Sequence, residues 1–506
     1  MTLSHAQARR PALAPLAALV LSACAGAVAP APPAGDPYVF TPPPAAAPPV
    51  GLDAATWTTH LRDDLLPFWT MDEAKGVPVG NFPTYRGMDG RLLSPTTRKP
   101  RMMARQIFAY AIGFALTGDE ALLDLARAGN RWLLDHARDT ARGGWHAELD
   151  LAGISTGDSD KLSQDMAYDT LGPAAWFWVT GDPEAEAAVL ATRDLLFDPA
   201  RYWDAPNGRI RDGMNAALTA EAYMGIPGSW ELVAQLDPVT AFLLLTQPLF
   251  TLPARRDQAL SDLHTLASRM QASFWRDGLF WGATGSVGSY GSNHSDFGHI
   301  LKAYGAVLQI DKRLPDHPFQ KFLSANAPST LTLAHDAPNG RWAKLPASPT
   351  VVRYGSDWWA YAEADQLAAS LAFHDPAWIA VLAQTARHFR EDYVDRTRPA
   401  REVVSSISQT GAWVYPWPDT DNAKCNQWKS GFHTSEHALV MYLFSSWLGG
   451  TTAPLYFAFP SGSVDAMAAA ARPYTLEGRV ARFEDLGPLT GDPSRHKVRV
   501  HFADLR

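Results

Sequence analysis

The 506-residue chain is 46% apolar and 19% charged, and its formal net charge is −8. This length and apolar content are sufficient for a large core in one big domain or two ordinary ones. The negative charge provides no basic field for nucleic acid, so we exclude nucleic-acid binding from the expected functions.

The N-terminus predicts an export signal. Arg9 and Arg10 precede a short apolar run, residues 13–20, which ends in Leu21-Ser22-Ala23-Cys24. The run is too short to span a membrane and is typical of a secretory signal. The final tetrapeptide resembles a bacterial lipobox, which implies removal of residues 1–23 and lipidation of Cys24. An ordinary secretory signal with a chance cysteine is the alternative.

The residue after Cys24 and the composition that follows extend this prediction. Ala25, rather than Asp, follows the cysteine; by resemblance to bacterial sorting rules this favours a lipid-anchored protein of the outer membrane, facing the periplasm. Residues 24–50 are rich in Pro and Ala and predict a tether. Apart from Cys24 the chain has one cysteine, Cys425. If Cys24 is lipidated, no intramolecular disulfide can form, and a cysteine-rich metal site is not expected.

Residues 51–450 carry a repeated helical pattern. Residues 114–135 and 177–198 each contain an apolar helix end, a Thr-Gly-Asp turn and an amphipathic helix, and residues 371–389 repeat the design more weakly. Gly118 and Gly181 suit C-caps, whereas Asp119 and Asp182 suit N-caps of the next helices. Repeated helical hairpins with room for about a dozen helices favour an all-α (α/α)6 barrel. In such a barrel the first turns of the inner helices line one end of a cavity.

The C-terminal extension, residues 451–506, has a different pattern. Its segments LEGRVARFEDL (residues 476–486) and HKVRVHFADL (496–505) alternate in polarity. This alternation predicts a short β hairpin packed on the barrel.

Two histidines stand at predicted helix starts. Ser295 or Asp296 can cap a helix whose first turn holds His299. In residues 428–450 we expect Thr434 or Ser435 as the cap and Gly449-Gly450 as the stop, with His433 at the helix mouth. If both helices are inner helices, the two imidazoles face one cavity. Such a pair suits removal of a proton from a carbon next to a carbonyl and its return elsewhere.

Other residues are candidates for the pocket. Arg105 lies on an otherwise apolar helix face and could stabilise an enediolate oxygen or cover apolar surface. Trp358 and Trp359 precede Glu363, a combination common in carbohydrate sites, although tryptophan pairs in helices are also core residues. Asp165 is a pocket candidate or a helix cap.

The chain resembles the N-acylglucosamine 2-epimerase family, which includes mannose and cellobiose epimerases and aldose–ketose isomerases on an (α/α)6 barrel. The resemblance spans about residues 68–447. It rests on RQIFAY (105–110), GGWHAELDLAG (143–153), DFGHILK (296–302), DWWAYAE (357–363) and WKSGFH (428–433). It implies that His299 and His433 are the acid/base pair and Arg105 the oxygen-binding cation, with the tryptophan helix in the pocket. It implies proton abstraction at C2 of an aldose or N-acyl hexosamine through an enediolate, without a metal or redox cofactor.

The sequence departs from the family pattern at three pocket positions. Lys302 stands where better-known members carry Glu, and Asp237 stands where the resemblance implies a further pocket His. His437, after Glu436, stands where an Arg is usual. These changes bear on the substrate and on the reaction itself.

Two other functions remain open on the sequence. An (α/α)6 glycoside hydrolase or lyase would need two opposed carboxylates. The candidates are Asp165, Asp237, Asp296, Glu363 and Glu436. A glycan-binding surface lipoprotein without catalysis would need aromatic side chains in the cavity and no accessible histidine.

Overall fold

The computed structural model describes residues 42–44, 47–157, 160–415 and 423–506. The predicted signal peptide, Cys24 and most of the tether lie outside these residues. The chain divides into residues 1–36 and the unit Pro37–Arg506, which is the part considered below. In this part, none of the described helices is long and apolar enough to cross a membrane.

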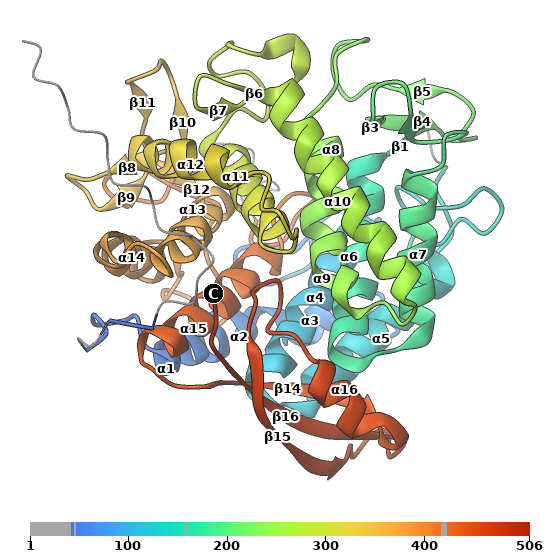
Figure 1. The fold of residues 1–506 in the computed structure, drawn as a ribbon. Helices are drawn as coiled ribbons and strands as arrows, with labels where there is room; N and C mark the ends of the chain where they lie inside the picture. The colour runs from blue at the N-terminus through green and yellow to red at the C-terminus, as the bar shows by residue number, and fades with distance from the viewer. Residues whose placement is uncertain (1–41, 45–46, 158–159, 416–422) are drawn as a thin grey trace, which may run out of the picture. The chain divides into compact units, whose positions relative to one another are not determined.

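A closed ring of inner helices forms the core. Among the described residues, six helical segments lie with nearly all side chains buried, each contacts the next, and the last contacts the first (Figure 1). They are α4 (Pro100–Thr117), α6 (Ser163–Thr180), α8 (Val233–Pro238) continued by η2 (Val239–Leu243) and α9 (Leu244–Thr246), α11 (Phe297–Asp311), α13 (Trp358–Ala372) and α15 (Phe432–Leu448).

An outer layer of amphipathic helices covers this ring and buries one face of each helix. These are α1 (Ala54–Thr59) with η1 (His60–Leu65) and α2 (Leu66–Trp69), α5 (Glu120–His136), α7 (Pro183–Leu196), α10 (Pro253–Phe274), α12 (Gln320–Ala334), and α14 (Ala377–His388) with η5 (Phe389–Tyr393). Helix α3 (Asp72–Lys75) and the single turns η3 (Gln247–Leu249), η4 (Thr284–Ser286) and η6 (Ser461–Ser463) lie in connections. The predicted (α/α)6 barrel is confirmed.

The predicted turns between paired helices are also confirmed. Gly118 and Gly181 are left-handed C-caps of α4 and α6, with φ of 71° and 65°. The Asp119 and Asp182 side chains accept hydrogen bonds from the first turns of α5 and α7. These two inner helices, α4 and α6, therefore reverse into their outer partners through the same pair of caps.

Short strands connect the helices near the starts of the inner helices (Figure 1). They are β1 (Asp160–Leu162), β2 (Trp203–Asp204), β3 (Arg209–Ile210), β4 (Gly213–Asn215), β5 (Glu221–Ala222), β6 (Trp275–Arg276), β7 (Leu279–Phe280), β8 (His335–Asp336), β9 (Arg341–Trp342), β10 (Leu345–Pro346), β11 (Val352–Arg353), β12 (Ser356–Asp357) and β13 (Ser406–Ile407). Strand β1 leads directly into α6 and β12 into α13, so these connections form a rim around one end of the barrel.

The C-terminal extension covers the other end. The expected hairpin is formed by β15 (Arg479–Pro488) and β16 (Arg495–Ala503), and β14 (Ala453–Pro460), which was not predicted, pairs with β16 to give the antiparallel order β14-β16-β15. Helix α16 (Val464–Ala470) follows β14. Arg495 donates a 2.7 Å hydrogen bond to the carbonyl of Thr180, the last residue of α6. The sheet therefore packs against the C-terminal ends of inner helices.

Candidate active site

Helix α11 presents His299 from its first turn. Asp296 is the N-cap, as expected, and its carboxylate accepts a 3.1 Å hydrogen bond from the His299 backbone N–H. The other carboxylate oxygen lies 2.7 Å from His299 Nδ1. One residue therefore both caps the helix and fixes the imidazole ring, which leaves the second ring nitrogen available to the cavity.

Helix α15 presents His433, but it starts earlier than predicted. The helix begins at Phe432 with Gly431 as N-cap, so the expectation that Thr434 or Ser435 caps it is wrong. Both hydroxyls bond back to the carbonyl of Gly431, at 3.2 and 2.7 Å. Ser and Thr within a first turn can satisfy their hydroxyls in this way, so they do not mark the boundary. The predicted stop is confirmed, since α15 ends at Leu448 with Gly449 as C-cap.

The two histidines meet in one cavity of about 150 Å³ at the N-terminal ends of the inner helices. The ring of Trp359 lies between them, with centroid distances of 4.7 Å to His299 and 5.8 Å to His433. The lining residues are Arg105, Gln164, Tyr168, Asp237, His294, His299, Lys302, Trp358, Trp359, Trp428 and His433.

Gly298 explains how Trp359 reaches this position. A Cβ atom at Gly298 would lie 2.5 Å from two ring carbons of Trp359, a distance that a side chain cannot adopt without displacing the indole. The glycine directly before His299 therefore lets α11 and α13 approach closely, and it sets the indole against the imidazole.

Arg105 enters the cavity from α4. Its guanidinium lies over the Tyr168 ring, 3.8 Å from the centroid, and donates a 3.1 Å hydrogen bond to the Trp428 carbonyl. Its Nε is buried without a hydrogen-bond partner in the described part of the chain. A buried cation with a free donor is suited to an oxygen that gains negative charge.

Asp237 and Lys302 form a buried ion pair at one side of the cavity. Lys302 Nζ lies 2.7 Å from Asp237 Oδ1 and donates a 2.9 Å bond to the Tyr168 hydroxyl, and Gln164 donates to the second Asp237 oxygen at 2.8 Å. Burial alone would raise the pKa of Asp237, but Lys302 holds it at about 2. Burial likewise opposes a charge on Lys302, and Asp237 keeps its pKa above the ordinary value. The two departures from the family pattern thus compensate each other.

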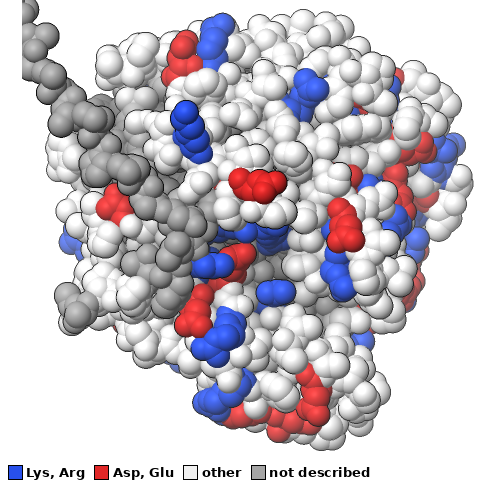
Figure 2. All heavy atoms as spheres, in the orientation of Figure 1, with Lys and Arg blue, Asp and Glu red and all other residues white. Residues whose placement is uncertain are grey.

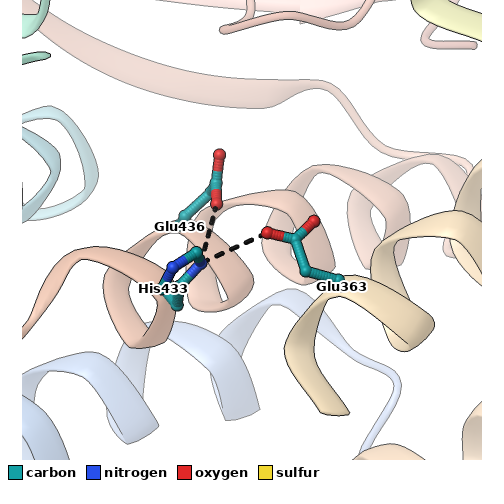
Figure 3. Close-up of side chains that lie close together, drawn as sticks. All are labelled: Glu363, His433 and Glu436. Atoms are coloured by element: carbon teal, nitrogen blue, oxygen red, sulfur yellow. Dashed lines mark ion pairs between the residues drawn. The ribbon is translucent and has the colours of Figure 1, made fainter. Parts of the chain in front are cut away.

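His433 lies beside two buried carboxyls (Figure 3). Its Nδ1 is 3.2 Å from Glu363 Oε1 and 3.9 Å from Glu436 Oε2, and both contacts converge on this one ring nitrogen. The 3.2 Å separation places the groups within ion-pair range, although Nδ1 makes no hydrogen bond within the described residues. Burial, followed by the charges of Arg105 and Lys302, lowers the pKa of His433 well below its ordinary value. The imidazole is therefore neutral at neutral pH and able to accept a proton.

The two carboxyls have raised pKa values. Burial raises the pKa of Glu363 to about 7, and burial together with the neighbouring Glu363 raises that of Glu436 to about 8. Their oxygens and His433 Nδ1 lie within 4.8 Å of one another, which makes them the candidates for a metal ion in the described part of the chain. However, Glu436 is bound by Tyr474, and the charges of Arg105 and Lys302 disfavour a further cation. We therefore interpret the cluster as the His433 imidazole paired with two carboxyl groups. The expectation that the protein needs no metal or redox cofactor stays a prediction.

A second, smaller cavity of about 70 Å³ continues along the barrel axis beyond this cluster. It shares Lys302 with the first cavity, and Glu363 and Glu436 face it rather than the first cavity. Thr475 and Leu476 of the C-terminal extension also line it. The His433 cluster therefore separates the mouth of the barrel from a space adjoining the extension.

Two sequence candidates lie elsewhere. Asp165 does not line the cavity and pairs with Arg101 at 2.8 Å. His437 is fully buried between α15 and the outer layer, with Nε2 2.9 Å from Asp365 and its ring against Trp57. His437 lies one helical turn after His433, and its side chain packs away from the cavity, against Asp365 and Trp57.

Sequence analysis did not name four of the lining residues as site candidates: Gln164, Tyr168, His294 and Trp428. Gln164 and Tyr168 lie four residues apart on α6, a spacing that puts them on one face of the helix. From this segment, sequence analysis named only Asp165 as a pocket candidate. His294 has a φ of 54° and its ring lies 4.7 Å from that of His299. Its position two residues before the Asp296 cap gave a weak signal, because loop conformation is not readable from the sequence.

Charge on the surface follows the composition. Basic and acidic side chains are interspersed on the face drawn in Figure 2, without a broad area of one sign.

Fold and site together define an (α/α)6-barrel protein with a polar cavity at the start of its inner helices. Residues 80–229 match the model of one family, described as N-acylglucosamine 2-epimerase (GlcNAc 2-epimerase). This match includes Arg105 and Tyr168 but ends before His299 and His433. A cellobiose 2-epimerase of Bacteroides fragilis is 27% identical over 135 residues, which are 25% of this chain and 32% of that protein. The match thus spans about a third of that relative.

Solved structures show the same fold over more of the chain. The cellobiose 2-epimerase from Spirochaeta thermophila has a TM-score of 0.65 at 17% identity and covers 78% of this chain and 96% of its own. A D-mannose isomerase has a TM-score of 0.63 at 19% identity, covering 79% and 100%. At these identities the similarity establishes the barrel and leaves the reaction to the site residues.

Proposed function

We propose that the protein is a sugar epimerase or aldose–ketose isomerase that acts at C2 of an aldose or N-acyl hexosamine. The observation that carries the proposal is the pair His299 and His433, which face one cavity on either side of Trp359. The match of residues 80–229 to the N-acylglucosamine 2-epimerase model supports the same reaction class. Two imidazoles on opposite sides of a flat substrate can remove a proton from one face and return it to another position or face.

The proposed chemistry begins with the open-chain sugar. The neutral His433 ring accepts the C2 proton, the C–H electrons form the C1–C2 double bond, and the C1 carbonyl becomes an enediolate oxygen. Arg105, with its free Nε donor, stabilises the negative charge on that oxygen. In epimerisation, His299, whose ring is fixed by Asp296, supplies a proton to the opposite face of C2, and the C1 carbonyl forms again. In isomerisation, the proton goes to C1 instead, the C2 hydroxyl loses its proton to form the ketone, and the C1 oxygen takes up that proton to become a hydroxyl. Each turnover ends with the two histidines exchanging protonation states, which solvent then restores.

Carboxylate-based hydrolysis is the weaker alternative. All five carboxyl candidates already have partners: Asp165 pairs with Arg101, Asp237 with Lys302, Asp296 with His299, Glu363 with His433, and Glu436 with Tyr474. A hydrolase would need an opposed pair free to act as acid and base across the cavity. A purely glycan-binding role is likewise less favoured, because His299 lines the cavity with a partly exposed ring.

Incubation with unmodified sugars in D2O tests the proposal. We expect deuterium at C2, formation of the epimer or ketose, and no cleavage of glycosidic bonds. Glycosidic cleavage without deuterium incorporation would support the carboxylate alternative. Binding without either product would support a glycan-binding protein.

We propose in addition that Cys24 anchors the protein in the outer membrane, facing the periplasm. The basis is the sequence pattern of residues 9–24. Expression with labelled palmitate in a Gram-negative host should label the wild-type chain and leave Cys24→Ser unlabelled. Equal labelling of both chains would contradict the proposal.

A further inference from the structure

Tyr474 reaches the barrel interior from the C-terminal extension. It lies between α16 and β15, its side chain is 2% exposed, and its φ is 63°. A left-handed conformation is unfavourable for a bulky non-glycine residue and persists only where the surroundings determine it. The backbone conformation at Tyr474 therefore indicates a position that the fold specifies.

Ring contacts from two helices, and a hydrogen bond to the next residue, hold this tyrosine in place. Its ring packs edge-on against Phe108 of α4 and Trp178 of α6. Next to it, Arg313, just beyond the end of α11, donates a 3.2 Å hydrogen bond to the Thr475 carbonyl. The ring is thus fixed by packing that does not involve the active-site cavity.

The Tyr474 hydroxyl ends at the His433 cluster. It donates a 2.5 Å hydrogen bond to Glu436 Oε1, and the other oxygen of the same carboxyl lies 3.9 Å from His433 Nδ1. Figure 3 shows Glu436 and Glu363 on the same side of the imidazole. Tyr474 of the extension is therefore linked to His433, the proposed base, through the Glu436 side chain alone.

We propose that Tyr474 and Glu436 are positioning residues for His433: the tyrosine holds the Glu436 carboxyl on the Nδ1 side of the ring, and Glu436 together with the nearer Glu363 favours the ring proton on Nδ1, which leaves the other nitrogen as the base. This inference rests on the proposed function and assigns the C-terminal extension a part in the reaction. Neither residue lines the cavity that would take the sugar.

Charge explains why this contact matters for turnover. When His433 accepts a proton it becomes a buried cation, which burial, Arg105 and Lys302 all disfavour. A carboxylate beside Nδ1 offsets that cost. Burial raises the pKa of Glu436 to about 8, and the Tyr474 hydrogen bond acts in the opposite direction. At neutral pH Glu436 of the resting protein is therefore mostly protonated, and it can balance the imidazolium only by ionising beside it. The Tyr474 hydrogen bond favours that ionisation, so its loss makes Glu436 harder to ionise when His433 gains a proton.

The test compares Tyr474→Phe with Tyr442→Phe. Both changes remove one hydroxyl from a contact between α15 and the extension, since Tyr442 donates a 2.8 Å bond to the Pro454 carbonyl. We expect Tyr474→Phe to lower kcat by roughly tenfold with KM changed less than about twofold, because the lost interaction strengthens only when the ring is charged. Tyr442→Phe should retain wild-type kcat. Equal kcat values for the two variants would overturn the inference.

Glu436→Gln provides a second arm. Glutamine keeps the shape and can accept the tyrosine bond but supplies no carboxylate. We expect kcat to fall at least as far as in Tyr474→Phe, and the double variant to be no slower than Glu436→Gln, because the two residues act through one contact. If the fold-losses in kcat of the two single variants multiply in the double variant, the residues act independently and the inference is contradicted.

A measurement on the resting protein separates failure of this inference from failure of the proposed function. Nitrogen-15 NMR of the histidine rings reports which nitrogen carries the proton, and the His433 signal is identified by its loss in His433→Ala. We expect a proton on Nδ1 in the wild type and a mixture of tautomers in Tyr474→Phe. An unchanged tautomer would overturn the inference whether or not any sugar is converted. A changed tautomer without C2 exchange would contradict only the proposed function.

Discussion

The starts of α11 and α15 carry the same local pattern in different surroundings. Each presents a histidine near the mouth of the barrel and a charged residue one turn later, Lys302 after His299 and Glu436 after His433. His299 is paired with the cap of its own helix and is 14% exposed at the side chain, whereas His433 is 7% exposed and lies beside two carboxyls from within the barrel. The difference indicates distinct roles: Asp296 fixes the orientation of the His299 ring, while the surroundings of His433 favour its neutral form.

The largest expected effect comes from removing either histidine. His433→Ala and His299→Ala should each lower kcat by about 10²–10⁴-fold, the usual contribution of a general acid or base. The roles predict a further difference in D2O: His433→Ala loses deuterium incorporation at C2, whereas His299→Ala retains it without forming the epimer. His264→Ala, at an exposed site, is the control. Retained exchange in His433→Ala alone would reverse the assignment.

The free energy of unfolding tests whether Lys302, one turn after His299, compensates the charge of Asp237. Lys302→Met leaves Asp237 buried without its cation, which should lower the free energy of unfolding by about 3–5 kcal/mol. The double variant Lys302→Met/Asp237→Leu should recover part of this loss, because both charges are then absent. Denaturant titration measures both. A single variant as stable as the wild type would show that the pair does not compensate as described.

Replacing Gly298 should disturb His299 more than His433. The added methyl group of Gly298→Ala meets the Trp359 ring at 2.5 Å, so the indole must shift. We expect kcat to fall by roughly 10-fold, on the scale of a misplaced site residue, with a smaller loss of stability. Gly305→Ala, on the same helix with open space at its Cβ, is the control. Equal activity of the two variants would contradict the role of the close approach.

The smallest expected effect is a pH-dependent change at Glu436. Its pKa is about 8 in the folded protein and near 4.5 when unfolded, so between these values the unfolded chain releases a proton that the folded protein keeps. Wild-type stability from this group therefore falls as pH rises from 4.5 to 8. Glu436→Gln has no ionisable group there and does not lose stability in this way. The Tm of the variant minus that of the wild type should therefore be roughly 1–3 °C larger at pH 8.5 than at pH 5. A constant difference in Tm would contradict the raised pKa.

The sequence predicted the elements that local chemistry controls. The Gly118 and Gly181 caps and the Asp296 cap follow from residues whose preferences act within one turn. The hairpin of β15 and β16 follows from alternation, but β14 pairs over a long distance with β16 and gave no local signal. The start of α15 was misplaced because a Ser or Thr hydroxyl can bond back within the first turn as readily as it caps.

For the candidate site, the sequence by itself determined the two histidines, Arg105 and the tryptophan helix, because each lies in a motif at the start of an inner helix. Only the tertiary structure decided which neighbours surround them. Asp237 and Lys302 become partners across 65 residues, His437 packs outward on Asp365, and Tyr474 arrives at His433 from the extension. Charge compensation in a buried cavity depends on distances between separate helices, and periodicity within one helix carries no information about them.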